Sequence, residues 1–364
     1  MKFEEIIFFY PSFEKGGVEK IITNLIKNFS KEGMKIHLIS SNKILKKKGL
    51  IKFYKVKKFD YRVYTSFFSV YNLVKVLINN LKRKEKICLF SLQSNSIAIF
   101  FGKILGYRVV IRNSEYPLGS IISLDDNIIK TSLIFIQKLI LYNWADLIIS
   151  NSRGSRNSIR QFVIKKEKVI NIYNPYIKKI LKQNLNYKNN SILFVGRLTK
   201  QKGIIYLLKA FSLFLKEYQN FKLLFVGSGP EKKLINKYAY ENKIVNKIKI
   251  IPWTSNLKKI YYSSKYFVLP SVYEGLGNVV IEALNYSRIC IVSDCKHGPS
   301  EILNNGKGGF IFKSKNYREL YKKLITVENN NNLGKKKIEY GRKKLNRFLI
   351  NNQCKKYLKA IQNL

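Results

Sequence analysis

The chain reads Pro270-Ser271-Val272-Tyr273-Glu274-Gly275-Leu276-Gly277-Asn278-Val279-Val280-Ile281-Glu282-Ala283-Leu284 directly after an apolar run at residues 266–269. The apolar run has the length of a buried strand, the glycines indicate a loop, and the spacing from residue 278 onward is helical. Since the first N–H groups of a helix lack partners within it, these groups and the Glu274 and Glu282 carboxylates would face the space above the strand end. The stretch therefore predicts a ligand site, in preference to Glu274 as a helix cap and Glu282 on a solvated face.

Short apolar runs alternate with longer helical stretches along the rest of the chain. Helical spacing is seen, for example, at residues 19–29 and 131–142. This alternation is typical of an α/β fold with mostly parallel sheets, in which ligands bind beyond the carboxyl ends of the strands. Strands are predicted at residues 6–10, 35–40, 87–90, 108–111, 147–150 and 169–173, and then at 192–195, 222–226, 247–251, 266–269 and 289–292.

The alternation pauses at one polar stretch, so the chain of 364 residues is expected to form two α/β domains. The predicted parts are a first domain at 1–173, a linker at 174–190, a second domain at 191–345 and a C-terminal helix at 346–364. The Asn-rich run at 328–332 is expected to be a surface loop, and residues 334–364 read as basic helix.

The composition is strongly basic, with 68 Lys and Arg against 22 Asp and Glu and a formal charge of +46. An apolar fraction of 46% argues against a disordered chain in spite of that charge. The charge implies attraction to polyanions, whether nucleic acid, anionic lipid headgroups or nucleotide phosphates. A/T-rich coding would also produce the excess of Lys, Ile, Asn, Tyr and Phe, so compositional drift and a selected surface both remain open.

The cysteines and the apolar windows bear on the cellular compartment. Cys88, Cys290, Cys295 and Cys354 lack the spacing of a zinc site and are interpreted as reduced thiols of a cytoplasmic protein. The acidic start is not a signal peptide, and no window reaches the roughly 18–20 uncharged apolar residues of a spanning helix. The sequence thus predicts a protein that does not cross a membrane.

Three further glycine loops follow predicted strands: Gly16-Gly17, the stretch from Gly196 to Gly203, and Gly227-Ser228-Gly229. Glycine lets a ligand approach the backbone, and the helix that follows presents N–H groups to an anion. Arg197 and Lys202 come just beyond a strand end, where a forked donor and a mobile point charge suit a phosphate group. Each loop taken alone is also compatible with an ordinary strand–helix connection.

In this order, the four motifs resemble those of the retaining glycosyltransferases of family 4, of the bacterial surface-polysaccharide type. The E-x7-E motif is Glu274 to Glu282, and residues 293–303 are similar to a version common among those bacterial enzymes. The resemblance covers nearly the whole chain. It implies the GT-B fold, in which two Rossmann-like domains face each other across a cleft, the first on the acceptor side, and the C-terminal helix returns to the first domain.

The resemblance implies a hexosyltransferase. Such an enzyme would move a hexose or N-acetylhexosamine from a nucleotide diphosphate-sugar, with a UDP-sugar favoured, to a lipid-linked or saccharide acceptor. The product would be a cell-surface glycan such as lipopolysaccharide, O-antigen or capsule. No Asp-x-Asp motif occurs in the chain, so neither a metal nor another cofactor is expected, and the nucleotide-sugar serves as co-substrate.

The resemblance also implies roles for individual residues. Glu274 would hold hydroxyls of the transferred sugar, and Arg197 and Lys202 would stabilise the leaving diphosphate; these three are the catalytic candidates. Glu282 would accept the ribose hydroxyls. The donor-binding set is Gly16, Gly17, Gly196, Gly227, Gly229, Pro252, Trp253, Gly275, Leu276, Gly277, Asn278, Val279 and Glu282.

The chain departs from the family in its first domain, where many relatives carry a histidine after the strand at 108–111. Here the sequence is Arg112-Asn113-Ser114-Glu115, so a role based on histidine is not transferred. The acceptor-side candidates are Arg112, Asn113, Glu115 and His297. The other histidine, His37, is interpreted as a strand residue.

Basic clusters in the first domain suggest a surface for anionic partners. They lie at residues 46–48, 55–58 and 82–84, and the last follows a stretch with helical spacing and aromatic residues at 67–77. A basic amphipathic helix suits anionic lipid, whereas the alternative is an ordinary helix with a solvated lysine face. Peripheral binding to the inner face of the cytoplasmic membrane is therefore one option.

Two other classes of protein remain as alternatives. The charge alone would suit a nucleic-acid-binding protein, but the sequence has no recognised motif and no stacking platform of aromatic residues. A GT-B-fold sugar-nucleotide epimerase would need acid and base groups that the sequence does not place. No specific nucleic-acid partner is expected.

Overall fold

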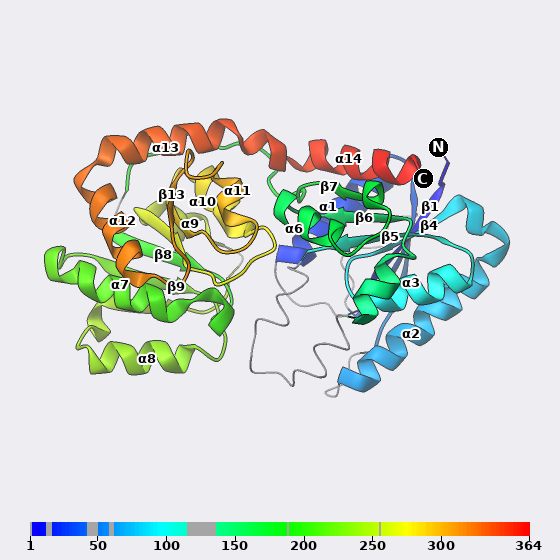
Figure 1. The fold of residues 1–364 in the computed structure, drawn as a ribbon, viewed down its shortest axis with the longest axis horizontal. Helices are drawn as coiled ribbons and strands as arrows, with labels where there is room; N and C mark the ends of the chain where they lie inside the picture. The colour runs from blue at the N-terminus through cyan, green and yellow to red at the C-terminus, as the bar shows by residue number, and fades with distance from the viewer. Residues whose placement is uncertain are drawn as a thin grey trace. The chain divides into compact units, whose positions relative to one another are not determined.

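The computed structural model describes residues 2–11, 17–41, 50–57, 62–114, 136–187, 189–254 and 256–364, without the side chains of 62–66 (Figure 1). Contacts divide the chain into two compact units. Unit 1 comprises Met1–Lys178 and Arg347–Leu364, and unit 2 comprises Lys179–Asn346. The segment at 174–190, expected to be a linker, is thus divided, and its second part packs on unit 2, where Arg288 donates to the Asn184 carbonyl oxygen at 2.6 Å.

Unit 1 is built on a parallel sheet of seven described strands in the order β3-β2-β1-β4-β5-β6-β7. The chain order reverses between β1 and β4, which are hydrogen-bonded neighbours. In open sheets of this kind, ligands bind at such a switch point, beyond the carboxyl ends of the strands. The strands are β1 (Glu5–Tyr10), β2 (Lys35–Ser40), β3 (Ile51–Lys55), β4 (Ile87–Ser91), β5 (Arg108–Asn113), β6 (Leu147–Ser150) and β7 (Val169–Asn171).

Helices cover both faces of the unit 1 sheet. On one face, buried side chains of α2, α3 and a helix at 136–142 form one core with Phe9, Leu89 and Ile111. On the other face, the rings of Phe90 and Tyr357 lie 6.1 Å apart. The bounds are α1 (Gly17–Lys31), α2 (Arg62–Asn79), η1 (Leu81–Lys86), α3 (Asn95–Ile104), α6 (Arg153–Arg160), η2 (Lys166–Lys168) and α14 (Ile350–Gln362).

The C-terminal helix α14 returns to unit 1, as the resemblance implied. It packs against α1. The Gln362 side chain accepts a hydrogen bond from the Phe3 N–H and donates one to the Phe3 carbonyl oxygen, both at 2.8 Å. These bonds join the two ends of the described chain within one unit.

Unit 2 repeats the same topology with a parallel sheet in the order β10-β9-β8-β11-β12-β13. Its switch point lies between β8 and β11. The strands are β8 (Ser191–Val195), β9 (Lys222–Val226), β10 (Ile248–Ile251), β11 (Tyr266–Leu269), β12 (Ile289–Ser293) and β13 (Phe310–Phe312). The helices are η3 (Lys200–Lys202), α7 (Ile204–Glu217), α8 (Lys232–Glu241), η4 (Val245–Lys247), α9 (Lys258–Ser263), α10 (Asn278–Asn285), α11 (Pro299–Ile302), α12 (Tyr317–Asn329) and α13 (Asn331–Lys343), and η5 (Leu345–Phe348) follows at the boundary of the units.

The structure confirms every predicted strand and adds two, β3 and β13. Both lie at sheet edges. β3 is only partly buried and carries two lysines among its five residues, so it lacks the apolar signal of a central strand. β13 has three residues and follows Gly308-Gly309, which leaves too short a run to recognise.

The prediction of a surface loop at 328–332 is wrong. α12 ends at Asn329 and α13 begins at Asn331, so Asn330 alone separates them. The Asn330 side chain accepts from the Leu333 N–H at 3.0 Å and caps α13. The run of asparagines indicated a loop, but one asparagine is enough to end one helix and cap the next.

Candidate functional site

Two loops at the switch point of unit 2 are joined by a network of polar contacts. The Lys202 ammonium forms an ion pair with the Glu274 carboxylate. The Val272 N–H donates to the Gln201 carbonyl oxygen at 2.8 Å, and the Gln201 side chain donates to the Tyr273 carbonyl oxygen at 3.0 Å. The loop after β8 and the loop after β11 therefore form one structure, because their strands are neighbours.

Glu274 is the buried carboxylate of these two loops, with 7% of the residue exposed. Besides the ion pair, its Oε1 accepts a hydrogen bond from Ser271 Oγ at 2.7 Å. A buried charge of this kind needs such partners, because burial removes its hydration. Burial, followed by the charge of Glu274, raises the pKa of the nearby Cys295 thiol to about 12, so this cysteine stays protonated at neutral pH.

Arg197 lies at the exposed start of the loop after β8. Its Nη2 lies 3.5 Å from Gln201 Oε1, at the limit of a hydrogen bond. The loop therefore carries two exposed cations, Arg197 and Lys200, and one, Lys202, that is mostly buried. This arrangement suits an anion that reaches the carboxyl edge of the sheet from outside.

Glycine is required where the loops pass close to one another. Gly203 has a φ of 63°, and a Cβ atom there would lie 2.1 Å from the Pro270 carbonyl oxygen. At Gly227 a Cβ atom would lie 1.9 Å from the Gly196 carbonyl oxygen. No side chain fits at such distances, so these positions hold the loops after β8, β9 and β11 against each other.

The second glutamate of the motif lies on α10, about one turn from its start. Gly277, with a φ of 81°, precedes the helix. Glu282 is half-buried, and its Oε2 accepts a hydrogen bond from the Tyr261 hydroxyl of α9 at 3.2 Å. The Tyr261 ring stacks on Tyr286 with centroids 4.9 Å apart. α9 and α10 thus fix the direction of the Glu282 carboxylate.

The predicted donor-binding residues of unit 2 lie in loops that follow strands, or on α10, at the carboxyl edge of one sheet. Pro252 and Trp253 follow β10, and both are exposed; Trp253 is 49% exposed. The structure brings together at this edge Gly196, Gly227, Gly229, Pro252, Trp253, Gly275, Leu276, Gly277, Asn278, Val279 and Glu282. In unit 1, Gly17 is the first residue of α1, whereas Gly16 lies outside the described residues.

Two acceptor-side candidates, Arg112 and Asn113, end strand β5 of unit 1 and are buried. Arg112 Nη2 donates to Asn174 Oδ1 at 2.5 Å. The Asn113 side chain donates to Ser155 Oγ at 3.1 Å and accepts from the Tyr142 hydroxyl at 3.3 Å. Both side chains therefore also support the packing of unit 1. Glu115 lies outside the described residues.

His297 belongs to the loop after β12 of unit 2. It is half-buried with a φ of 68°. The backbone of the neighbouring Lys296 pairs with that of Tyr273 in an isolated parallel β-bridge, and Tyr273 lies in the loop that carries Glu274. Burial, and then the charge of Lys296, lowers the pKa of His297. Its imidazole is therefore neutral at pH 7 and can both donate and accept a hydrogen bond.

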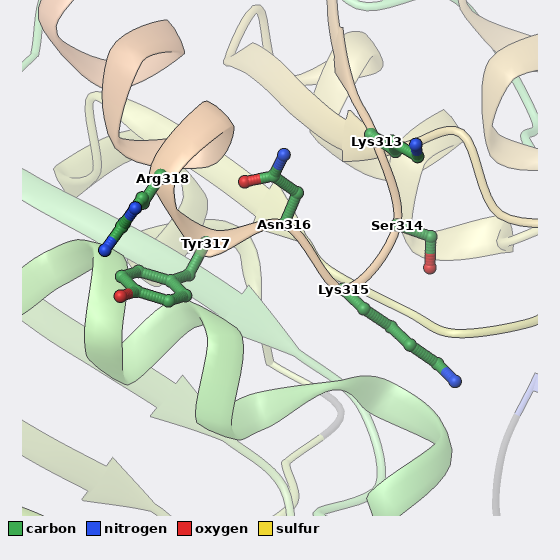
Figure 2. A pocket seen from close by; sticks show the side chains of 6 residues that line it. All are labelled: Lys313, Ser314, Lys315, Asn316, Tyr317 and Arg318. Carbon is green, nitrogen blue, oxygen red and sulfur yellow. The ribbon is translucent and has the colours of Figure 1, made fainter.

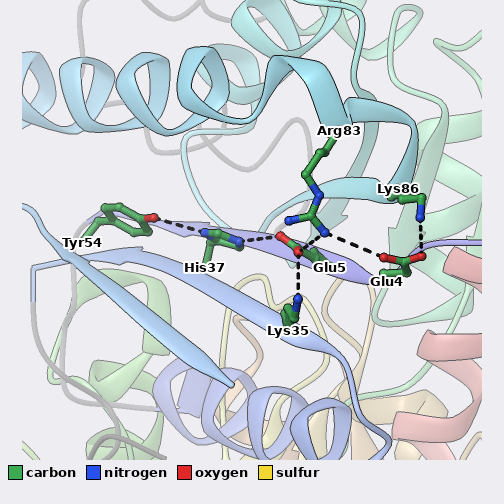
Figure 3. A network of polar contacts seen from close by, with 7 residues as sticks. All are labelled: Glu4, Glu5, Lys35, His37, Tyr54, Arg83 and Lys86. Atoms are coloured by element: carbon green, nitrogen blue, oxygen red, sulfur yellow. Dashed lines mark hydrogen bonds and ion pairs between the residues drawn. The ribbon is translucent and has the colours of Figure 1, made fainter. Parts of the chain in front are cut away.

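His37 is a strand residue, as predicted. It lies buried in β2, with Nε2 2.8 Å from Glu5 Oε2 and Nδ1 3.2 Å from the Tyr54 hydroxyl (Figure 3). Burial lowers the pKa of His37 more than the hydrogen bond with Glu5 raises it. Figure 3 shows Arg83 and Lys35 meeting the same Glu5 carboxylate, so the group is a structural network at the start of the sheet.

A surface hollow of about 520 Å³ lies at the loop between β13 and α12 (Figure 2). None of the predicted donor residues lines it. Ser314 Oγ reaches the Ser271 carbonyl oxygen at 3.4 Å, so the hollow borders the loop that carries Glu274. Figure 2 shows Lys315 pointing away from Tyr317 and Arg318. The ammonium group of Lys315 and the guanidinium group of Arg318 are therefore separated.

Sequence reasoning missed three residues that position the site: Ser271, Gln201 and Tyr261. Ser271 lies three residues before Glu274, a spacing that could have indicated a local hydrogen bond. Gln201 and Tyr261 act across the fold and leave no local signal. Among the residues that the structure describes, no group of three or more His, Cys, Asp or Glu side chains could hold a metal ion. Within the same residues, no helix has both the length and the apolar character needed to span a membrane.

Comparison with known proteins points to one family of enzymes. Residues 177–344 match the family model of the glycosyl transferases group 1. The chain is similar to an uncharacterized glycosyltransferase of Haemophilus influenzae, with 26% identity over 318 residues that span 86% of this chain and 87% of the relative. It is also 26% identical over 340 residues, 90% of this chain and 91% of the relative, to the N-acetylgalactosamine-N,N'-diacetylbacillosaminyl-diphospho-undecaprenol 4-alpha-N-acetylgalactosaminyltransferase of Campylobacter jejuni.

A solved structure supports the fold. Anabaena Alr3699/HepE, crystallised with UDP and glucose, matches with a TM-score of 0.78 at 14% identity, covering 100% of both chains. With this neighbour and two parallel sheets of the same topology, the GT-B fold expected from the motifs is confirmed.

Proposed function

We propose, because residues 177–344 match the family model of the glycosyl transferases group 1, that this chain is a glycosyltransferase. It moves a hexose or N-acetylhexosamine from a nucleotide diphosphate-sugar, with retention at the anomeric carbon. The acceptor is a lipid-linked or other saccharide of cell-surface glycan synthesis, and a UDP-sugar is the favoured donor. The Campylobacter relative, by its name, acts on a diphospho-undecaprenol-linked sugar, and the Anabaena structure holds UDP. These two facts support the choice of acceptor and donor.

The contact between Lys202 and Glu274 carries this proposal. It joins a cation suited to a phosphate and a carboxylate suited to sugar hydroxyls at the switch point of one sheet. An ammonium group has three N–H donors, and the ion pair with Glu274 uses one of them. Lys202 can therefore hold the diphosphate while its partner Glu274 holds the adjoining sugar, so that the anomeric bond lies between them.

The proposed reaction forms one bond and breaks one on the same face of the sugar. The acceptor hydroxyl oxygen bonds to the anomeric carbon, the bond from that carbon to the diphosphate oxygen breaks, and the hydroxyl proton passes to the departing phosphate. Negative charge grows on the diphosphate as it leaves. Lys202, Arg197 and the first N–H groups of α10 stabilise that charge. Lys202, which is paired with Glu274, and the N–H groups of α10 are in place before the reaction, so they need little reorganisation.

We propose that these cations serve in place of a divalent metal and that no cofactor takes part. Glu282, held by Tyr261, accepts from the ribose hydroxyls, and the base lies near Trp253. Arg112, Asn113, Glu115 and His297 are the candidates for contacts with the acceptor or the transferred sugar. The enzyme then works in the cytoplasm, at the inner face of the membrane that holds a lipid-linked acceptor.

Donor binding is the first test. In a thermal-shift screen of UDP-, GDP- and ADP-sugars, at least one donor should raise the melting temperature, because a ligand that binds only the folded protein stabilises it. The shift should be lost in Lys202→Ala and Arg197→Ala and kept in Lys200→Ala, a matched control on the exposed surface of the same loop. A wild-type protein that responds to no nucleotide-sugar would overturn the proposal.

A further inference from the structure

The helix α2 of unit 1 is apolar on two opposite sides. Its inner side contributes Leu73, Val76 and Leu77 to the core. Its outer side exposes Phe67, Tyr71 and Ile78, with 67%, 54% and 51% of each residue accessible. These three positions are separated by four and seven residues, so they lie along one side of the helix. A surface helix normally presents polar residues there.

The apolar surface continues at the end of α3, which lies beside α2 in Figure 1. Ile104 is 60% exposed. The Tyr107 hydroxyl, just after α3, donates to the Leu77 carbonyl oxygen of α2 at 2.6 Å. A Cβ atom at Gly106 would lie 2.7 Å from Lys84 Nζ. These contacts bring the end of α2, the helix η1 and the end of α3 to one corner of unit 1.

The same surface is basic. Residues 62–104 carry seven Lys and Arg and one acidic residue, Glu85. Ion pairs with Glu4 and Glu5 engage Arg83 and Lys86. Lys75, Lys82 and Lys84 form no ion pair within the described part of the chain, and Lys75 Nζ lies 5.7 Å from the centre of the Tyr71 ring. Lysines thus lie beside the exposed aromatic and aliphatic residues.

Unit 2 has little comparable surface. Its large exposed apolar side chains, among the described residues, are Tyr240, Val245 and Trp253, and the last belongs to the proposed donor site. The lysine-rich composition extends over both units, whereas the paired exposure of aromatic residues along one helix is found on α2. Compositional drift explains excess lysine more readily than this placement of apolar residues.

We propose that the α2 face, defined as Phe67, Tyr71, Lys75, Ile78, Lys82 and Ile104, docks on an anionic lipid bilayer. The apolar side chains enter the boundary between headgroups and acyl chains, and the lysines meet the anionic headgroups. A second copy of the chain is a poor occupant, because it would bring two proteins of charge +46 together. The docking extends the proposed function, on which its biological purpose rests, since a lipid-linked acceptor lies at that surface.

Vesicle binding tests the proposal. The full chain should sediment with vesicles of phosphatidylcholine and phosphatidylglycerol, and at least tenfold less with phosphatidylcholine alone. The pair Phe67→Asp and Tyr71→Asp should lower binding to the mixed vesicles at least tenfold, whereas Tyr240→Asp, at a 79% exposed aromatic residue of unit 2, should change it less than twofold. Unchanged binding of the aromatic pair would overturn the proposal.

A second pair of variants separates a defined face from the total charge. Lys75→Glu with Lys82→Glu should lower binding at least tenfold, whereas Lys232→Glu with Lys233→Glu, two exposed lysines of unit 2, changes the net charge equally and should have less than a twofold effect. Equal losses would mean that net charge alone drives binding. A wild-type dimer that the Phe67 and Tyr71 variants convert to a monomer would show an interface between copies and would also overturn the proposal.

The donor-dependent thermal shift distinguishes a failure of the docking from a failure of the proposed function. Variants of the α2 face should keep the full shift, and Lys202→Ala should keep full vesicle binding. Vesicle binding without any donor shift in the wild type would refute the proposed transfer and leave the docking in place. A donor shift without vesicle binding would refute the docking alone.

Discussion

Replacing Lys202 by Met and Glu274 by Gln, singly and together, separates the structural role of their ion pair from its proposed role in transfer. The two side chains are 13% and 9% exposed. Two unit charges about 4 Å apart attract by about 4 kcal/mol at an effective dielectric constant of about 20, and the cost of burial offsets part of this. The net coupling between the two residues should therefore be about 1–3 kcal/mol in stability.

Each single variant leaves one charge without its partner in a mostly buried site. Loss of one partner of a fully buried pair costs about 3–5 kcal/mol, and the partial exposure here lowers the expected cost to about 2–3 kcal/mol. Ser271 still donates to Glu274 in the Lys202 variant. The double variant removes both charges, so it should be less destabilised than the sum of the single variants.

Transfer should respond differently from stability. Loss of one group that stabilises developing charge typically lowers the rate by about 100-fold or more, and each single variant should show a loss of this size. The double variant should stay at that low level, because removing both groups relieves the unpaired charge without restoring contacts to the diphosphate or to the sugar.

The two tryptophans, Trp144 and Trp253, lie one in each unit, so a Trp144→Phe background lets fluorescence in urea report the unfolding of unit 2. Transfer would be measured with the donor found in the thermal-shift screen. Matched controls are Lys200→Met and Glu241→Gln, both at exposed positions. If the double variant regained transfer together with stability, the pair would be structural only and the proposed mechanism would fail.

Three further predictions follow from the same contacts. Gly203→Ala should destabilise unit 2 by more than the roughly 1–2 kcal/mol expected for a left-handed residue, because its Cβ would meet the Pro270 carbonyl oxygen, whereas Gly33→Ala, at φ 84° with nothing within 4 Å, should cost only that amount in urea unfolding. As pH falls below about 6.5, His37 binds a proton more readily in the unfolded chain than in the folded protein, where its pKa is lowered, so the melting temperature of unit 1 should fall. His37→Gln should lessen that fall, and an equal fall in the variant would contradict this explanation. Transfer and donor binding should persist in excess EDTA, and a loss that Mg²⁺ or Mn²⁺ restores would show that the reaction needs a metal.

Much of the fold could be predicted because its signals are local. A buried parallel strand reads as a short apolar run, and the helices between such runs have their own spacing, so alternation along the chain was enough to indicate two parallel sheets. The edge strand β3 was not predicted, because an exposed strand lacks the run of apolar residues that marks a buried one. The prediction of a loop at 328–332 failed, because the composition of a segment does not tell how many of its residues are needed to end a helix.

The candidate site divides in the same way. Its candidate residues could be recognised in the sequence, since Glu274, Arg197 and Lys202 lie in glycine loops after predicted strands and Glu282 lies on the helix that follows one of them. The strand order could not be predicted from the sequence. That order makes β8 and β11 neighbours, and for this reason Lys202 contacts Glu274, which lies 72 residues further along the chain. Ser271, Gln201 and Tyr261, which orient these side chains, became visible only with that pairing.

The class of fold, the glycine loops and the candidate site residues can be recognised from the sequence alone, because they depend on neighbours along the chain. Tertiary structure decided which loops meet, which carboxylate is buried and which side of α2 remains exposed. Those properties depend on strand pairing and packing between distant segments, and no local pattern of residues encodes them.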